Sequence, residues 1–209
     1  MTTTPPADLA ALIGSRICHD LVNPLGAIGN GVELLEMVQA PSPELALLAQ
    51  STAQAQATLR LFRLAFGAAR ADQHTPGRDM PALLNAALPA APPRIETALP
   101  ESLPRSDARL IALLMLCCQS ALPWGGQVTL AGAEDEARNG AGGVNWQITA
   151  CAERMRIDAA LWRSLSDPAA PLPGLTPAQV HFALVPPALA ASDRRLDLAL
   201  AETAIDLSF

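Results

Sequence analysis

Apolar residues recur at steps of three and four along residues 8–37, which is the spacing of one face of an α-helix. The stripe runs through Ile13, Ile17, Leu21, Leu25, Ile28, Val32 and Leu35. A proline-rich stretch at residues 40–43 then interrupts the pattern. The spacing therefore predicts one long amphipathic helix that stops near residue 40.

A second helix is predicted from Glu44, where the apolar positions alternate strictly between steps of three and four. These positions are Leu45, Leu48, Thr52, Ala55, Leu59, Phe62, Phe66 and Ala69. Two helices joined by a short turn predict an antiparallel hairpin. Because both stripes are broader than one partner helix can cover, we expect two hairpins to pair in a four-helix bundle, as a homodimer.

The pattern changes after the second helix, where His74, Thr75, Pro76 and Gly77 are typical of a linker. Beyond it, helical and alternating patterns predict helices near 80–88, 106–122, 158–164 and 177–182, and strands near 94–98, 127–131, 144–150, 195–199 and 202–208. We therefore expect a helical hairpin domain over residues 1–72, a linker over 73–79 and an α/β sandwich with a largely antiparallel sheet over 80–209.

Composition excludes several classes of function. The net charge is −6, and the fourteen basic residues, all arginine, form no positive run, so a nucleic-acid partner is not expected. No stretch approaches the roughly twenty apolar residues that span a bilayer, and the first eight residues lack a signal-peptide pattern. These features predict a cytoplasmic protein that does not bind a membrane.

The four cysteines form no C-x-x-C pair and have no histidine at metal-ligand spacing. We expect Cys18, Cys117, Cys118 and Cys151 to be reduced core or helix residues, and we expect this chain to bind no metal or cofactor. Cys18 precedes His19, but adjacent helical residues point about 100° apart and do not readily pair as nucleophile and base.

His19 is predicted to point away from the apolar core of its own helix. At about 100° per residue from Ile13, the apolar stripe centres near 60° and His19 falls near 240°. The same side carries small or polar residues, namely Ser15, Arg16, Asn23, Gly26 and Asn30. This face therefore predicts a docking surface for a protein that brings its own active site.

An exposed histidine suits phosphoryl carriage, because one nitrogen of a neutral imidazole attacks while the other holds a proton. A receiver domain can supply Mg²⁺ and a lysine from its own site. Arg16 and Asn23, one turn before and after His19, are candidates for contact with the phosphoryl group or the partner, and Asp20 is a candidate to hold the imidazole. A solvated helix face carries the same three residue types.

The sequence His19-Asp20-Leu21-Val22-Asn23-Pro24-Leu25 resembles the H-box in the dimerisation and phosphotransfer domain of sensor histidine kinases. The longer run over residues 15–31 resembles more closely the alphaproteobacterial ChpT-type histidine phosphotransferases. The resemblance implies a kinase-like dimer that carries phosphohistidine at His19, with a second domain similar to a degenerate kinase ATPase domain. It also implies that the donor is the receiver domain of a hybrid histidine kinase and that the acceptors are response regulators.

Kinase nucleotide motifs are not recognisable in the second domain. Working kinases place an asparagine in the apolar helix before the sheet, where this chain has Gln119 or Ser120. After the strand at 144–150, kinases carry an aspartate and glycines, whereas residues 151–156 read Cys-Ala-Glu-Arg-Met-Arg. No glycine-rich phosphate loop occurs either. The sequence thus favours a phosphotransferase over an ATP-dependent kinase.

Two alternatives stay open at this point. One is an autophosphorylating histidine kinase with a divergent nucleotide site, which ATP-dependent labelling would reveal. The other is a non-catalytic scaffold or antikinase, whose hairpin inserts into other kinase bundles and whose activity survives the replacement of His19.

Overall fold

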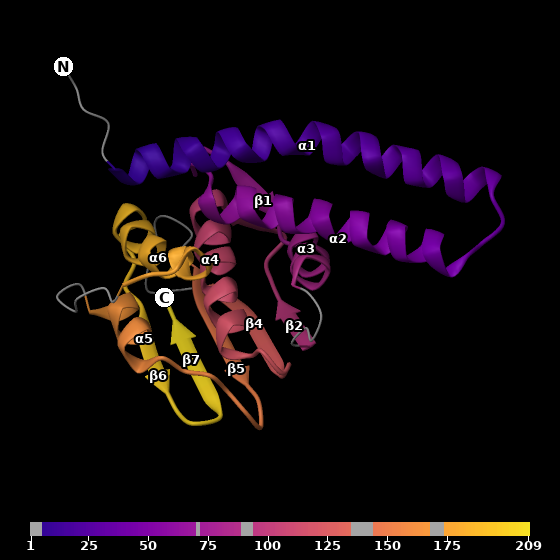
Figure 1. Ribbon diagram of the computed structural model, residues 1–209. Helices are drawn as coiled ribbons and strands as arrows, with labels where there is room; N and C mark the ends of the chain where they lie inside the picture. Colours follow the sequence, from indigo (N-terminus) through magenta and orange to yellow (C-terminus); the bar gives the residue numbers. More distant parts are fainter. Residues whose placement is uncertain (1–5, 70–71, 89–93, 135–143, 168–173) are drawn as a thin grey trace, which may run out of the picture.

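The computed structural model describes residues 6–69, 72–88, 94–134, 144–167 and 174–209. Two long antiparallel helices lie across one end of an α/β unit, in which helices cover one face of a twisted sheet (Figure 1). The predicted order, with a helical hairpin first and an α/β unit second, is therefore observed.

The hairpin consists of α1 (Pro6–Val38) and α2 (Pro43–Phe66). The side chain of Ser42 caps α2 by accepting a hydrogen bond from the backbone N–H of Leu45 at 3.1 Å, and Pro43 occupies the first turn. The helices pack closely at Gly29, where an added Cβ would collide with the side chain of Gln56. Gln56 instead donates a hydrogen bond to the carbonyl of Leu25 at 3.1 Å, which ties the two helices together.

The α/β unit is built on a five-stranded sheet with the order β2-β4-β5-β7-β6. Only the β2–β4 pair is parallel among these strands, so the sheet is largely antiparallel as predicted. Its strands are β2 (Arg94–Ala98), β4 (Gln127–Glu134), β5 (Val144–Cys151), β6 (Asp197–Leu200) and β7 (Ala204–Ser208). The other elements are β1 (His74–Pro76), α3 (Asp79–Ala87), β3 (Ser102–Pro104), α4 (Arg105–Ala121), α5 (Ala159–Ser166), the 3₁₀ turn η2 (Pro177–Gln179) and α6 (Val180–Ala191).

Each central strand alternates between buried and accessible side chains. In β5, Trp146, Ile148 and Ala150 are buried, whereas the intervening Gln147 is exposed and Thr149 is half-buried. This is the pattern of an antiparallel sheet with one face packed on a core. Helices α4, α5 and α6 cover that face (Figure 1).

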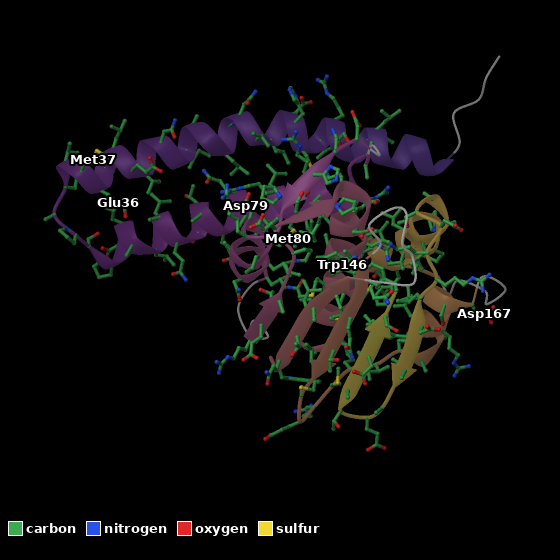
Figure 2. The ribbon with its side chains drawn as sticks, turned by 180° about the vertical axis from the view of Figure 1, so that it is seen from behind. Glu36, Met37, Asp79, Met80, Trp146 and Asp167 are labelled. Atoms are coloured by element: carbon green, nitrogen blue, oxygen red, sulfur yellow. The ribbon has the colours of Figure 1, made fainter. Side chains whose placement is uncertain are left out.

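Helix α4 forms the centre of the core and is apolar on nearly every side. Leu113, Leu114 and Met115 are fully buried, as expected for a helix without a polar face. Leu61 and Leu64 of α2 belong to the same hydrophobic cluster. The C-terminal half of α2 therefore packs on the α/β unit, while the tip of the hairpin, with Glu36 and Met37, extends beyond it (Figure 2).

Two local features differ from the sequence-based expectation. Within the expected linker, β1 pairs with β3, and Thr75 lies opposite Leu103. Helix α6 continues to Ala191 through Pro186 and Pro187, although the helix was expected near residues 177–182. Each proline removes a backbone donor. The burial of Phe182, Val185 and Leu189 in the core offsets this loss.

Three of the four cysteines occupy the predicted environment. Cys18 packs in the hairpin, and Cys117 and Cys118 are fully buried in α4. Burial raises the pKa of the Cys118 thiol to about 12, so the reactive thiolate is not populated near neutral pH. Cys151 differs, because it is exposed at the end of β5.

A buried ion pair joins α4 to the segment before β6. A carboxylate oxygen of Asp107 lies 2.6 Å from Nη2 of Arg194, and both side chains are at least nine-tenths buried. Trp146 donates its indole N–H to the same carboxylate at 2.8 Å, and Arg194 also donates to the carbonyl of Val144 at 2.8 Å. Asp107 therefore accepts hydrogen bonds from the buried indole of Trp146 and from the largely buried guanidinium of Arg194.

We expect Asp107→Ala to destabilise the fold by about 3–5 kcal/mol, because it leaves a buried guanidinium without its counter-charge. Urea unfolding followed by circular dichroism measures this change. The matched control is Asp79→Ala, which removes the exposed pair with Arg78 at 3.7 Å and should change stability by less than about 1 kcal/mol. Equal losses in the two variants would contradict the role given to Asp107.

Candidate functional site

His19 lies on the open side of α1, and its side chain is 76% exposed. Its Nδ1 atom is 3.2 Å from a carboxylate oxygen of Asp20. The other oxygen of Asp20 accepts a hydrogen bond from Nε of Arg16 at 2.7 Å. The hydrogen bonds from His19 and Arg16 lower the pKa of Asp20, which favours the ionised carboxylate.

The contact with Asp20 has a consequence for the imidazole. A carboxylate only accepts hydrogen bonds, so a neutral His19 in this contact carries its proton on Nδ1. The lone pair then resides on Nε2. The arrangement is suited to nucleophilic attack by Nε2, with a positive charge on the ring stabilised by Asp20.

The remaining predicted residues of this face are only partly brought together. Ser15 and Asn23 line a pocket of 390 Å³ beside His19. Arg16 is engaged with Asp20, one turn further along its own helix. Gly26 and Asn30 lie further along α1 and do not line the pocket, and a Cβ added at Gly26 would meet no atom within 4 Å.

The pocket beside His19 also contains residues that the sequence analysis missed. The lining from outside α1 is Arg63 and Gly67 at the end of α2, then Ala68, Gln73 and Arg105. The available signal was the recurrence of arginine near the end of one helix and at the start of another. The sequence alone does not show that these arginines are close together. The fold brings Arg105, directly after β3, next to Arg63 of α2.

Two arginines at the start of α4 hold the end of α2. Arg105 donates from Nη2 to the carbonyl of Arg63 at 3.4 Å, and Arg109 donates from Nε to the carbonyl of Ala65 at 3.1 Å. Both carbonyls belong to the last turn of α2, where helices leave acceptors without intrahelical donors, although the carbonyl of Arg63 also accepts the backbone N–H of Gly67. Burial, followed by the nearby charges of Arg63 and Arg109, lowers the pKa of Arg105, which indicates that positive charge is concentrated here.

A separate groove of 1050 Å³ lies between α2, α4, α5 and α6. Gln119 and Ser120, the residues found where kinases have asparagine, are part of its lining. The hydroxyl of Ser120 donates to the carbonyl of Cys117 at 2.7 Å. His181, which also lines the groove, is buried, and burial lowers its pKa to about 4. It is therefore neutral at physiological pH.

Metal-ligating side chains do not gather in the part of the chain that the structure describes, where no group of three or more His, Cys, Asp or Glu residues could hold an ion. The same described ranges contain no helix with the length and apolar character needed to cross a membrane.

Comparison with known proteins adds evidence from sequence. Residues 77–204, more than half of the chain, match the family described as the histidine phosphotransferase C-terminal domain. The chain is also 51% identical over 67 residues to the protein phosphotransferase ChpT of Brucella abortus (strain 2308). That match covers 32% of this chain and 32% of the relative, so it spans about a third of the length of each.

Solved structures share the fold. A structure of a bacterial phosphotransferase matches with a TM-score of 0.67 at 24% identity, over 99% of this chain and 98% of that one. Full-length ShkA in complex with AMPPNP matches with a TM-score of 0.53 at 14% identity, over 96% of this chain and 45% of that one. These likenesses confirm the predicted fold class of a helical hairpin followed by an α/β domain. With the family match over residues 77–204, they support one conclusion: the chain belongs to the family of the histidine phosphotransferase C-terminal domain.

Proposed function

We propose that this chain is a phosphotransferase that relays a phosphoryl group through a phosphohistidine at His19. The observation that carries the proposal is the exposed imidazole of His19, held by Asp20 within an H-box-like sequence. Membership of a histidine phosphotransferase family and identity to a Brucella phosphotransferase over part of the chain add support.

The proposed reaction consists of two in-line displacements. Nε2 of His19 attacks the phosphorus of an aspartyl phosphate on the receiver domain of a hybrid histidine kinase. The N–P bond forms, the P–O bond breaks, and the receiver's aspartate leaves as a carboxylate. The aspartate of a response regulator then attacks the phosphohistidine, and the electrons of the N–P bond return to Nε2.

The protein requirements of this reaction are small, because phosphoryl transfer depends mainly on positioning and on charge neutralisation. We propose that the receiver domain supplies Mg²⁺ and a lysine, and that this chain binds no cofactor for the transfer. Asp20 stabilises the positive charge on the ring when Nε2 carries the phosphoryl group. The relay is proposed to operate in the cytoplasm, where response regulators act.

We also propose that the active form is a homodimer. Ile13, Ile17 and Ile28 on α1 are 52%, 54% and 51% exposed in the single chain. They belong to the apolar stripe of α1, in which Val32 is buried while these three isoleucines stay exposed. Soluble proteins seldom expose a continuous apolar strip of this kind, and a second hairpin would bury it in a four-helix bundle.

The receiver domain is proposed to dock on the His19 face of α1, which includes Asn23, Gly26 and Asn30. Asn23 and Asn30 are exposed, and the space around Gly26 is open. A receiver must bring its aspartate within bonding distance of Nε2, so the small or short side chains at Asn23, Gly26 and Asn30 favour close approach.

We expect His19→Ala to abolish acid-labile labelling from a phosphorylated receiver domain, because the variant lacks the nucleophile. The matched control is His74→Ala, since His74 is an exposed histidine in β1 and should leave labelling unchanged. Labelling of the wild type by ATP alone would identify a kinase. Absence of label from cognate receivers and from ATP would favour a scaffold.

We expect Ile28→Arg to convert the dimer into a monomer, because it places a charge in the middle of the apolar stripe. Light scattering after size-exclusion chromatography should give half the wild-type mass. Asn30→Arg, on the face of His19, is the control and should stay dimeric. A wild type that is monomeric at micromolar concentration would refute the dimer.

We expect Gly26→Leu to slow transfer from a receiver by about tenfold or more, since a bulky side chain would hold the partner away from His19. The substitution should not destabilise the helix, because leucine is favoured over glycine in a helix interior by roughly 0.5–1 kcal/mol. Single-turnover labelling and urea unfolding measure the two effects. An unchanged transfer rate would show that the receiver does not approach over Gly26.

A further inference from the structure

The pocket beside His19 has the composition of an anion site. Its described lining brings together His19, Asn23, Arg63, Gln73 and Arg105, and none of its lining residues is acidic. A neighbouring pocket shares Arg63 and Arg105. The geometry points to a phosphoryl-binding subsite in which the guanidinium groups of Arg63 and Arg105 hold the oxygens of the group carried by His19.

This inference deepens the proposed function and rests on His19 as the phosphoryl carrier. It assigns a role to Arg63 and Arg105, two residues outside α1. The ligand they would bind is a dianion that resembles a phosphate monoester. Arginine suits this ligand because its planar guanidinium presents several N–H donors that match phosphate oxygens in pairs.

The anchoring of Arg105 favours such a role. Its 3.4 Å contact with the carbonyl of Arg63 holds the side chain in the lining of the pocket, and one contact does not exhaust the five N–H donors of a guanidinium. The side chain is only partly accessible, so water competes less for its donors than at an open surface. Arg105 is therefore preorganised for an anion.

The clustering of like charges points the same way. Arg63 and Arg109 lie close enough to Arg105 for their charges to act on it. Like charges held together in a folded protein repel one another, and a bound dianion relieves that repulsion. Arg16 is not among the residues that line this pocket, and its Nε donates to Asp20.

The subsite would also give the α/β unit a part in the chemistry. Arg105 is the first residue of α4, the central helix of that unit, whereas His19 belongs to the hairpin. Stabilisation of the phosphoryl group by Arg105 would favour phosphohistidine over the aspartyl phosphate of the receiver. The position of α4 against α2 would then influence how long His19 keeps its phosphoryl group.

The test uses the full chain and inorganic phosphate as the probe. In the wild type, phosphate should shift the NMR signals of the His19 ring. Arg63→Gln and Arg105→Gln should each bind phosphate about tenfold more weakly, as expected for the loss of a charged hydrogen bond. The matched control is Arg94→Gln, because Arg94 is 81% exposed in β2 and should leave binding unchanged.

A second readout follows phosphohistidine directly. After labelling by a phosphorylated receiver, the labelled fraction at equilibrium should fall several-fold in Arg63→Gln and Arg105→Gln, and Arg105→Lys should recover part of it because the charge is kept. Urea unfolding identifies any variant that fails to fold. If Arg105→Gln does not fold, Arg105→Lys takes its place in the phosphate titration.

The two proposals fail in different ways. If His19 never gains label but phosphate still binds through Arg63 and Arg105, the anion site stands and the relay through His19 is lost. If His19 gains label but phosphate does not perturb its ring, or does so equally in wild type, Arg63→Gln and Arg105→Gln, the subsite is overturned.

Discussion

The seating of α2 on α4 is the interaction on which the rest of the architecture depends. The last turns of α2 contribute Leu61, Leu64 and Ala65 to the core of the α/β unit. Arginines at the start of α4 donate hydrogen bonds to carbonyls at the end of α2. The contact between the two helices therefore combines apolar packing with hydrogen bonds to the backbone. Because this junction lies beside the His19 turn of α1, the packing that joins the two parts of the chain also builds the candidate site.

The same constraint explains why α1 is poorly covered. Helix α2 packs on the α/β unit with its C-terminal half, and among the described residues it is the helix that makes extensive contact with α1. Cys18 and Val32 are buried, while Ile13, Ile17 and Ile28 stay exposed. A helix with a wide apolar face and one partner carries uncovered surface, which a second hairpin could bury without disturbing the face of His19.

The sequence was informative where a local pattern determines local structure. The long helix around His19, the apolar helix near Leu113 and the alternation in β5 follow from periods of 3.6 and 2. The continuation of α6 to Ala191 was not predicted, because core packing by Phe182, Val185 and Leu189 holds the helix through two prolines. The short β1–β3 pairing and the meeting of Arg105 with His19 were not predictable, since both depend on long-range return of the chain. A single sequence contains no direct signal for such contacts.

The proposed phosphoryl carriage by His19 contains a conflict of charges, and the residues around His19 reduce it. An anion on Nδ1 fixes the tautomer and stabilises the cationic ring, yet it repels an incoming dianion. Arg16 binds the far oxygen of Asp20 at 2.7 Å, which neutralises much of that field while leaving the near oxygen on His19. Arg63 and Arg105 add positive charge to the pocket that His19 also lines. The imidazole is thus oriented by Asp20, whose negative charge is partly neutralised by Arg16. It also lines a pocket with an excess of positive charge. This arrangement favours the proposed acceptance of a phosphoryl group at Nε2.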